Sequence, residues 1–464
     1  MCSLGCDFTI ETVFDEPVGL EYVSGKSKTG GKLCAKGNYI FDLIHHSHRL
    51  IEPRTPDGPI PWRDAVSLIS RQLAKTTDDG SVGLIMEGDV PVEDILAGRL
   101  FADKCAGSPW FKVRFATGDD TVVRAIRSAG VVPQAVDPGL LKNSEFVLTI
   151  GDPFEVSPVI AGPVLSWKQS SRRNAFLAVS PENNRTASFS SRHLRIAGRT
   201  FCADLLRAVI DRHDGRPVPW ADTVKQSGKG NEISSVVSSV AERLFTKKSV
   251  IIVETQDPVI AGLAALVSSV VAIQGVWWLT SYGNAFDICS VDCESTDMED
   301  IIGALQSGKM KTLIVLGSNL AMNGDWIKIR NHLNGLEFLV AGSPFESELT
   351  EIADLVLPTA LWCETGGTLN GKFRPAAIAP PGAALSYGDI MRRLISNMGV
   401  RAGTKDIHFE SPIIPVADDY VAELISSARD TFHGAEHRST VISYGDGFIS
   451  GMSRFMNAEK AVSQ

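Results

Sequence analysis

The sequence predicts an α/β protein built around parallel, doubly wound sheets. Short apolar runs of strand length alternate with longer amphipathic segments between residues 81 and 341, as expected for strands joined by crossover helices. Two of the apolar runs, at residues 147–150 and 313–316, lead directly into glycine and a polar residue. A chain of 464 residues exceeds what one hydrophobic core usually holds, so we expect about two to four domains.

Composition limits the classes of function. The net charge of -9 gives no general attraction to nucleic acid or to anionic membranes. The N-terminus lacks a secretion signal, and the most apolar region, residues 259–279, is interrupted by polar residues, which argues against a membrane span. Eight cysteines without an export signal suggest a reducing compartment. We therefore expect a cytoplasmic protein with no transmembrane segment.

The first three cysteines form a candidate metal site. Cys2 and Cys6 have C-x3-C spacing, and alternation in residues 8–12 and 18–22 predicts a hairpin that would bring Cys34 beside them. Three converging cysteines are typical of an iron–sulfur or zinc site. Both sites usually have four protein ligands, and we expect no fourth cysteine within reach. These residues leave open a bound cluster or an empty remnant, with zinc less favoured.

The segment after the cysteines predicts one long helix. Residues 40–54 have helical character and end at a proline. Their three histidines, His45, His46 and His48, are interpreted as surface or capping groups rather than as a replacement ligand.

Further elements follow from hydrophobic periodicity and from the proline and glycine residues that end each element. Helices are expected at residues 61–73, 92–105, 159–167, 201–210, 233–244, 259–271, 298–305 and 326–333. Strands are expected at residues 81–86, 111–115, 145–150, 176–179, 193–196, 249–253, 276–279, 312–316, 338–341 and 355–357. Residues 214–231, which contain little apolar sequence, are interpreted as a linker.

Glycine turns at strand ends are candidate ligand contacts. Gly151 follows the strand at residues 147–150, and Gly317 and Asn319 follow the strand at residues 313–316. At the carboxyl end of a parallel strand, such a turn faces the crevice where doubly wound sheets bind ligands. The two similar turns indicate a paired nucleotide-binding architecture. Many parallel strands end this way without a ligand, so the repeat supports the fold more than the ligand.

Residues 353–382 contain the second candidate. A short strand ends at Pro358, and a loop rich in glycine and polar residues follows. Glycines let a backbone approach a ligand closely, and polar side chains can fix its orientation. The residues alone leave open a ligand loop or a glycine-rich surface loop. The candidate ligand residues are Glu364, Gly367, Thr368, Asn370 and Arg374.

Four groups of residues together resemble the molybdopterin oxidoreductase superfamily. The resemblance covers roughly residues 1–400, and its last group is the most specific because the residues recur in the same order and near the same spacing. The four groups are Cys2, Cys6 and Cys34 with Leu33, Ala35, Lys36, Gly37, Phe41, Asp42, His45, His46, Arg49, Leu50 and Pro53; Ile60, Pro61, Trp62 and Ala65; residues 315–319; and residues 353–358 with Glu364, Gly367, Thr368, Asn370, Gly371, Arg374 and residues 380–382.

The resemblance implies a domain plan. A small iron–sulfur-type β domain would occupy residues 1–50. A discontinuous Rossmann-like domain would combine residues 51–120 with 295–400, and a second Rossmann-like domain would be inserted at residues 121–294. Residues 401–464 would form a C-terminal tail, and we expect the family's C-terminal barrel domain to be absent.

The resemblance also implies site residues. The three N-terminal cysteines would bind a [4Fe-4S] cluster, and Lys36 would lie on the electron path between cluster and pterin, where a cation would stabilise added negative charge. A molybdopterin or tungstopterin guanine dinucleotide would contact Gly151, Gly317, Asn319, Glu364, Gly367, Thr368, Asn370 and Arg374.

The chain departs from the family pattern at both metal sites. The family has a further cysteine two residues before the position of Cys2, and this chain has none there. The family's molybdenum ligand is usually cysteine, selenocysteine, serine or aspartate, and this chain offers only Asp119 or Asp120 in the corresponding region. A carboxylate oxygen suits a hard metal, although adjacent aspartates after glycine more often cap a helix.

Two relatives share the shortened plan: the B subunit of formylmethanofuran dehydrogenase and the large iron–sulfur subunit of NADH dehydrogenase. A third possibility is the cofactor-free homologue of the formylmethanofuran protein in formyltransferase/hydrolase complexes. We expect an electron-relay or scaffold subunit of a multi-subunit oxidoreductase or C1-transfer complex. The alternative is a catalytic molybdenum or tungsten bis-pterin subunit that acts on formate or a formyl C1 compound.

Overall fold

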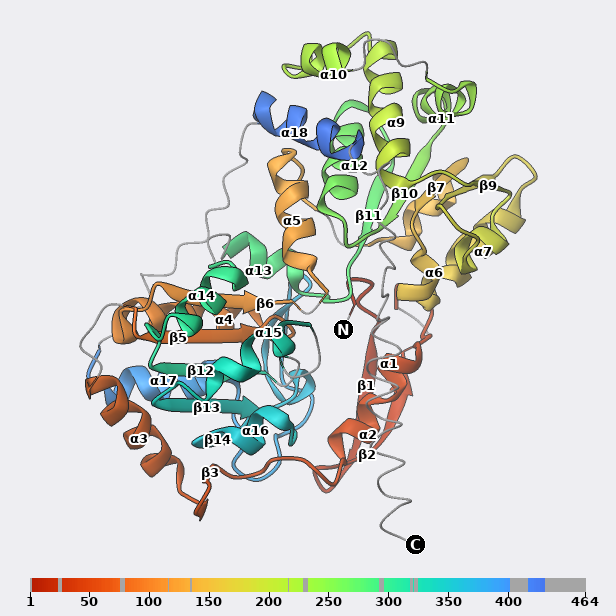
Figure 1. The fold of residues 1–464 in the computed structure, drawn as a ribbon. Coiled ribbons are helices and arrows are strands. Elements are labelled where there is room, and N and C mark those ends of the chain that lie inside the picture. The colour runs from red at the N-terminus through yellow and green to blue at the C-terminus, as the bar shows by residue number, and fades with distance from the viewer. Residues whose placement is uncertain are drawn as a thin grey trace, which may run out of the picture.

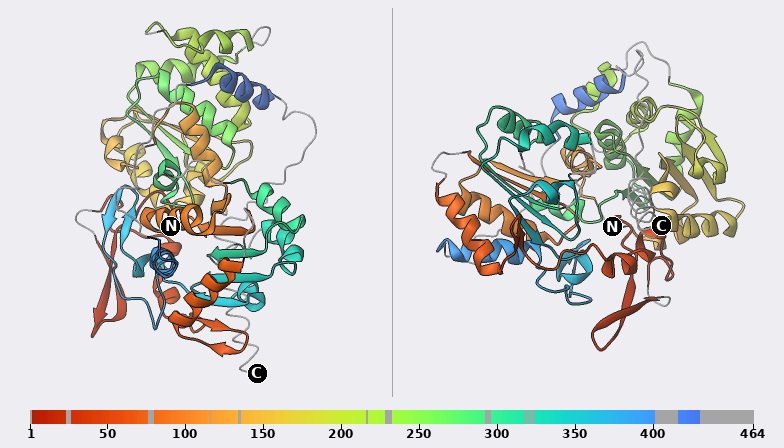
Figure 2. Two further views of the ribbon diagram at one scale, coloured as in Figure 1. Left: turned by 90° about the vertical axis from the view of Figure 1, so that its left-hand side faces the viewer. Right: turned by 60° about the horizontal axis from the view of Figure 1, so that its bottom comes forward.

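The computed structural model describes residues 2–23, 27–75, 80–115, 117–133, 136–215, 217–227, 233–291, 296–317, 320, 324–400 and 416–429. Two lobes, each built around a mainly parallel sheet, lie beside an N-terminal hairpin (Figure 1). The predicted α/β class with doubly wound parallel sheets is confirmed. Figures 1 and 2 show the N-terminus where the two lobes and the hairpin meet.

The first lobe contains a parallel sheet of order β11-β10-β7-β8-β9. Alternate side chains of β7 face two separate cores, Leu148 on one face and Val147 on the other, so the strand is apolar throughout. Helices α5, α9, α11, α12 and α18 contribute to the first core, and α7 to the second. The elements are β7 (Phe146–Ile150), β8 (Ala175–Val179), β9 (Arg192–Leu194), β10 (Ser249–Glu254), β11 (Gly275–Leu279), α5 (Asp119–Ser128), α6 (Pro153–Val156), α7 (Ala161–Ser170), α8 (Arg185–Phe189), α9 (Gly198–Arg212), α10 (Ala221–Ser227), α11 (Ser235–Thr246), α12 (Pro258–Val270) and α18 (Asp418–Arg429).

The second lobe contains a sheet of order β4-β3-β14-β13-β12-β5-β6, in which only the β14–β3 and β3–β4 pairs are antiparallel. Helices α3, α4, α13 and α17 cover one face, and α14, α15 and α16 cover the other (Figure 1). Its strands come from two separated parts of the chain. The elements are β3 (Arg54–Thr55), β4 (Gly58–Pro59), β5 (Val82–Glu87), β6 (Trp110–Arg114), β12 (Thr312–Leu316), β13 (Phe338–Ser343), β14 (Leu355–Pro358), α3 (Trp62–Lys75), α4 (Val92–Phe101), α13 (Ala285–Val291), α14 (Met298–Gln306), α15 (Gly324–Leu333), α16 (Glu348–Ile352) and α17 (Tyr387–Asn397).

Each sheet has one point where its strand order reverses direction. In the first lobe the chain proceeds from β7 toward one edge and later returns to β10 on the other side of β7. In the second lobe β5 and β12 have the same relationship. Crevices at the carboxyl ends of such strand pairs are the usual ligand sites of doubly wound folds.

Two small hairpins complete the fold. The predicted N-terminal hairpin is present as β1 (Phe8–Val13) and β2 (Glu16–Tyr22), followed by α1 (Ala35–Asn38) and α2 (Ile40–Ile44). The second hairpin consists of β15 (Gly367–Leu369) and β16 (Lys372–Arg374), within the predicted ligand loop.

The long helix predicted for residues 40–54 is wrong, because helix α2 already ends at Ile44. Beyond it the Leu50 amide donates to the carbonyl of Pro344, and Arg49 forms a bridge with Phe345. The Leu50 amide and the His48 carbonyl, which accepts the Glu346 amide, are therefore satisfied by a distant segment rather than by another helical turn.

The linker predicted at residues 214–231 contains a helix, α10, and is therefore also corrected. Trp220 and Val224 are buried in the core of the first lobe, which stabilises a helix that the local composition did not predict. Helices α5, α13, α16, α17 and α18 were likewise missed by the sequence analysis. Within the described ranges, no helix is long and apolar enough to cross a membrane.

Helix α18 shows that residues from the C-terminal part of the chain stabilise the first lobe. Ile425 is 1% exposed, so Ile425→Ala should lower the free energy of unfolding by about 2–5 kcal/mol through lost burial and a cavity. Urea denaturation of the full chain measures this effect. Ser426→Ala, at an exposed position of the same helix, should change stability by less than about 0.5 kcal/mol. Equal midpoints for both variants would contradict the packing of α18.

Candidate functional site

The three N-terminal cysteines converge at the junction of the two lobes. Cys2, Cys6 and Cys34 are all partly buried and pack against one core cluster of the first lobe. Burial, followed by the nearby charges of Cys2 and Cys34, raises the pKa of the Cys6 thiol to about 12. A bound cation would offset this cost, because thiols bind metals only as thiolates.

The loop that carries Cys2 and Cys6 is fixed to the carboxyl end of β11. Leu4 is 1% exposed in the core. The Ser3 hydroxyl donates to the carbonyl of Trp278 over 3.0 Å, and the Thr280 amide donates to that hydroxyl over 2.9 Å. These contacts hold the cysteines at the strand end rather than on a free terminus.

A cavity of about 540 Å³ lies beside Cys34. Its walls come from the segment around the cysteine and from residues after α6, including Lys32, Pro158 and Gly162. Lys36 follows Cys34 in the short helix α1 and is partly exposed. The thiol site therefore has adjacent space and at least two cationic side chains in the same segment.

Within the described residues, no group of three or more His, Cys, Asp or Glu side chains is placed to hold one metal ion. This finding concerns a single ion, whereas the ligands of an iron–sulfur cluster bind different irons.

In the predicted ligand loop, Glu364 is fully engaged by a distant arginine. Arg49 Nη1 and Nη2 donate to the two oxygens of Glu364 over 2.8 and 2.7 Å, and the two side chains are 5% and 1% exposed. The second oxygen also accepts the amide of Leu361. This carboxylate fixes residues 1–50 against the loop and has little capacity left for a ligand.

Thr368 is also satisfied by protein groups. Its amide and hydroxyl donate to the two oxygens of Glu93 over 2.8 and 2.7 Å. Gly367 permits this approach, because a β-carbon there would overlap Pro91.

Asn370 and Arg374 join the hairpin β15–β16 to the cysteine loop. Asn370 adopts a left-handed backbone with φ of 51°, and a β-carbon at Gly5 would lie 3.0 Å from its Nδ2. Arg374 donates to Asp7 over 3.2 Å. The structure thus brings the predicted loop and the predicted thiol site together, with protein–protein contacts between them.

A glutamate lies against the glycine turn at each of the two points of strand reversal. Glu254, at the end of β10, accepts the Asp152 amide over 2.9 Å, and a β-carbon at Gly151 would overlap its backbone oxygen. Glu87, at the end of β5, lies so close to Gly317 that a β-carbon there would overlap its side chain. Glu87 also accepts from Arg114 over 2.7 Å in a buried ion pair.

These two turns therefore do not fit the phosphates of a dinucleotide. A phosphate at a strand-end turn needs free backbone N–H groups and no neighbouring negative charge. The Asp152 amide is already used by a carboxylate, and a second carboxylate covers Gly317. The predicted contact Asn319 lies outside the described residues.

The sequence contained a signal for the two glutamates that the sequence analysis missed. In each case a strand ends in glutamate and proline-valine follows four residues later: Glu87 precedes Pro91-Val92, and Glu254 precedes Pro258-Val259. Helices α4 and α12 begin at these points. Each of the two glycine turns thus has a glutamate at the end of the neighbouring strand: Glu254 lies beside Gly151, and Glu87 lies beside Gly317.

Asp119 and Asp120 begin helix α5 after Gly118. Asp120 accepts from Lys112 over 3.0 Å and from Arg124 over 3.2 Å, so its charge is compensated. Asp119 accepts the Tyr282 amide over 2.7 Å, and burial raises its pKa to about 6. The assignment of either as a metal ligand stays a prediction.

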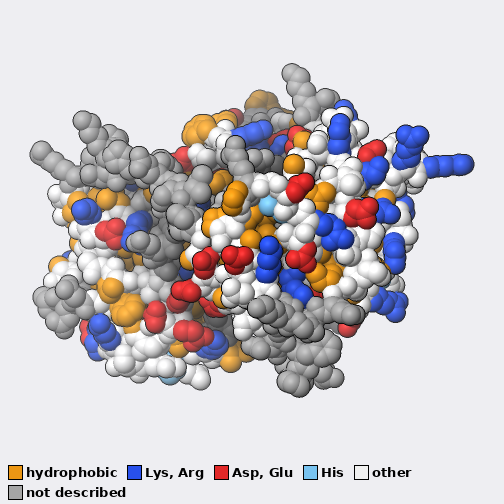
Figure 3. All heavy atoms as spheres, turned by 90° about the horizontal axis from the view of Figure 1, so that it is seen from above, with side chains coloured by type: hydrophobic (Ala, Val, Ile, Leu, Met, Phe, Trp, Pro, Cys, Tyr) orange, Lys and Arg blue, Asp and Glu red, His pale blue; other side chains and the backbone are white. Residues whose placement is uncertain are grey.

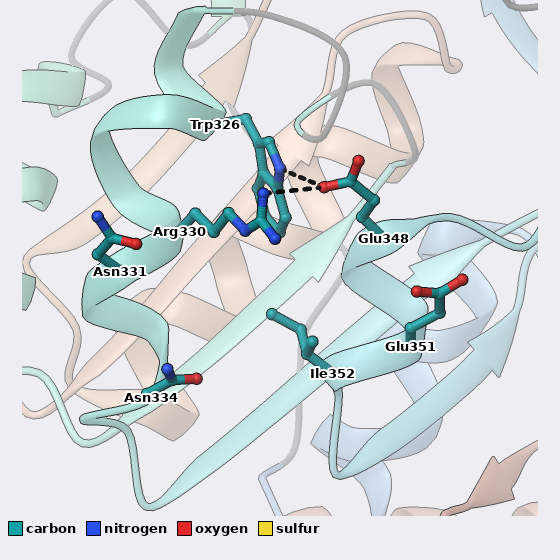
Figure 4. A pocket seen from close by; sticks show the side chains of 7 residues that line it. All are labelled: Trp326, Arg330, Asn331, Asn334, Glu348, Glu351 and Ile352. Carbon is teal, nitrogen blue, oxygen red and sulfur yellow. Dashed lines mark hydrogen bonds and ion pairs between the residues drawn. The ribbon is translucent and has the colours of Figure 1, made fainter.

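A surface groove between α15 and α16 contains none of the predicted site residues. Its volume is about 570 Å³, and Figure 4 shows Trp326 and Arg330 directed toward Glu348. On the face shown in Figure 3, acidic and basic side chains are interspersed, in keeping with a net charge that does not favour nucleic acid.

The fold and site together define a class: a pair of doubly wound lobes with a cysteine-bearing N-terminal segment at their junction. No protein-family model matches the chain. The chain is 24% identical to the alpha subunit of the F420-dependent formate dehydrogenase of Methanocaldococcus jannaschii, over 86% of this chain and 69% of that protein.

Two further comparisons agree with this class. The chain is 25% identical to the G subunit of the NADH-quinone oxidoreductase of Streptomyces coelicolor, over 82% of this chain and 49% of that protein. Acetylene hydratase from Pelobacter acetylenicus has the same fold with a TM-score of 0.64 and 14% identity, over 86% of this chain and 68% of that chain. The proteins that the chain is similar to are members of the molybdopterin oxidoreductase superfamily, the family that its residue pattern resembles.

The buried Arg49–Glu364 pair should contribute strongly to stability. Arg49→Leu leaves an uncompensated buried carboxylate and should lower the free energy of unfolding by about 3–5 kcal/mol. The matched control is Arg54→Leu, which removes a more exposed pair with Glu346 and should cost less than about 1 kcal/mol. Chemical denaturation of both variants measures the difference. A similar cost for the two substitutions would show that burial of the pair is unimportant.

The raised pKa of Asp119 predicts a dependence of stability on pH. The folded state binds the proton more tightly than the unfolded chain does, so the contribution is complete below about pH 4 and is lost as pH rises through about 6. The free energy of unfolding of the wild type should therefore fall by about 3 kcal/mol across that interval, and Asp119→Asn should abolish this fall. Unfolding free energies measured from pH 4 to 7 test this, with Asp57→Asn, at an exposed position, as control. A slope that survives in Asp119→Asn would contradict the assignment.

Proposed function

We propose that this chain is an electron-relay subunit of a multi-subunit oxidoreductase complex, with a [4Fe-4S] cluster at Cys2, Cys6 and Cys34 and no pterin dinucleotide. A cluster supplies single-electron transfer when bound. The observation that carries the proposal is the contrast between two regions. Three thiols lie close enough to interact, whereas a glutamate lies against the glycine turn at each of the two strand ends that would receive dinucleotides.

The side chains around the thiols support a relay. Lys36 lies two residues beyond Cys34 in α1 and would stabilise negative charge added to a cluster. Lys28 lies in the same segment, and its ammonium donates to the carbonyl of Val136 over 3.0 Å. Burial, with a smaller contribution from Lys372, lowers the pKa of Lys28.

The proposal also includes the domain organisation of the chain and the existence of partner chains. The seven-stranded sheet combines strands from both sides of the inserted lobe, which supports the division into residues 51–120 plus 295–400 and residues 121–294. We propose residues 1–50 and 401–464 as the remaining parts, with α18 packed on the first lobe. Because the similar formate dehydrogenase and NADH-quinone oxidoreductase proteins are named as subunits, we propose partner chains that complete a redox or C1-transfer complex. We further propose that the complex acts on formate or a related C1 compound in the cytoplasm.

Elemental analysis of the anaerobically purified complex tests the proposal. We expect about four irons per chain, and neither molybdenum nor tungsten. Cys34→Ala should remove most of the iron, whereas Cys105→Ala, at a partly buried cysteine outside the thiol site, should retain it.

Two results would overturn parts of the proposal. Molybdenum or tungsten at one equivalent per chain would restore the catalytic bis-pterin alternative. Absence of iron from the intact complex would reduce the chain to a scaffold subunit without a relay.

A further inference from the structure

The tip of the N-terminal hairpin exposes apolar side chains to solvent. Phe14 is 97% exposed, and Val13 and Val18 are each 52% exposed. Figure 2 shows the hairpin β1–β2 extending away from both lobes. We infer that the hairpin tip, residues 13–18, docks into an apolar pocket rimmed by lysine or arginine on a partner chain, an inference that rests on the proposed existence of partner chains.

The turn at the hairpin tip holds Phe14 in a conformation that aromatic residues rarely adopt. Val13 pairs with Glu16, so Phe14 and Asp15 form a two-residue turn, with φ of 51° and 67°. Such turns favour asparagine and glycine, because a left-handed backbone crowds the β-carbon of other residues. The Phe14 ring lies almost wholly in solvent, so contacts within the described chain do not offset this cost. An intermolecular contact would offset it.

A β-bulge adds Val18 to the hairpin tip. The strand pairing shifts after Glu11, which leaves Val18 without a partner on β1, and bulges of this kind redirect side chains. The neighbouring Pro17 has no N–H group, and its carbonyl accepts from His45 Nε2 over 2.9 Å. Addition of a partner strand at this edge is therefore disfavoured, and we expect the partner to recognise side chains.

The base of the hairpin is fixed to the rest of the protein. Ile10 is 8% exposed and belongs to a core cluster with Ile40 and Leu361. Asp7 accepts from Arg374 over 3.2 Å. Because the hairpin is anchored before it meets a partner, docking requires little further ordering of the chain, which favours affinity.

The charge of the hairpin indicates the chemistry of the partner. Residues 7–22 contain five carboxylates and neither lysine nor arginine. The four carboxylates beyond Asp7 form no ion pair with any described residue: Glu11, Asp15, Glu16 and Glu21. They would repel the same surface of a second copy and attract basic side chains around an apolar pocket.

The complex purified through a tag on this chain provides the first test. After separation of the chains, Phe14→Ala should raise the dissociation constant for the stoichiometric partner chain about thirtyfold in calorimetric titration, as expected for a central aromatic contact. Phe189→Ala, at a 49% exposed ring at the end of α8 in the first lobe, should leave this constant unchanged. Phe14→Ala should unfold at the wild-type temperature, because its ring is exposed, so weaker binding would not reflect misfolding.

The charge and the occupant are tested separately. The double variant Glu11→Gln with Glu16→Gln should associate more slowly than the wild type, with a weaker dependence on ionic strength and little change in dissociation rate. Photocrosslinking from p-benzoylphenylalanine at position 14 should link this position to a partner peptide that contains apolar residues and lysine or arginine.

The contrary results separate this inference from the proposed function. An unchanged dissociation constant in Phe14→Ala overturns the docking surface, while the proposed partner chains stand. Crosslinks to a second copy, or to residues 401–464 of the same chain, overturn the assigned occupant, and an association rate independent of salt overturns its basic rim. If no stoichiometric partner accompanies the tagged chain, the proposed partner chains fail, and the docking surface fails with them.

Discussion

The buried ion pair between Arg49 and Glu364 positions the region around which the protein is organised. It joins residues that are 315 positions apart, and both charges are removed from water, so each requires the other. Arg49 ends the N-terminal segment that carries the cysteines, and Glu364 begins the loop that reaches back to them. This bidentate contact therefore supports the thiol site from outside, together with the hydrogen bonds that hold Ser3 to the end of β11.

Buried carboxylates also explain how the strand-end turns of the two sheets are satisfied. Doubly wound sheets offer ligand crevices where the strand order reverses, and both sheets here retain that topology. At each crevice a glutamate from the neighbouring strand covers the glycine turn. Glu87 is neutralised by Arg114, and Glu254 is bonded to a backbone amide. The architecture is thus shared with the superfamily, while the groups at the strand ends are internally satisfied.

The thiol site differs from the two strand ends, where the carboxylates are satisfied within the protein. Desolvation and mutual repulsion disfavour thiolates there, and nearby lysines and a cavity provide positive charge and space. Such a site gains stability when a cationic group binds, because the cost of burying thiolates is then offset. Electron relay through this point would place the redox centre where both lobes and the N-terminal hairpin meet.

The sequence by itself determined the class of fold and the candidate site types. Strands buried on both faces must be continuously apolar, so β7, β10 and β12 were recognisable from local composition, as were the glycine turns and the C-x3-C spacing. The tertiary structure decided the partner of each polar residue. Helix α10 depends on burial of Trp220, the segment after α2 is held by Pro344, and Ser157 meets Cys2 across 155 positions. These contacts join segments distant in sequence, and no local pattern encodes which buried charge or hydroxyl will be satisfied by which neighbour.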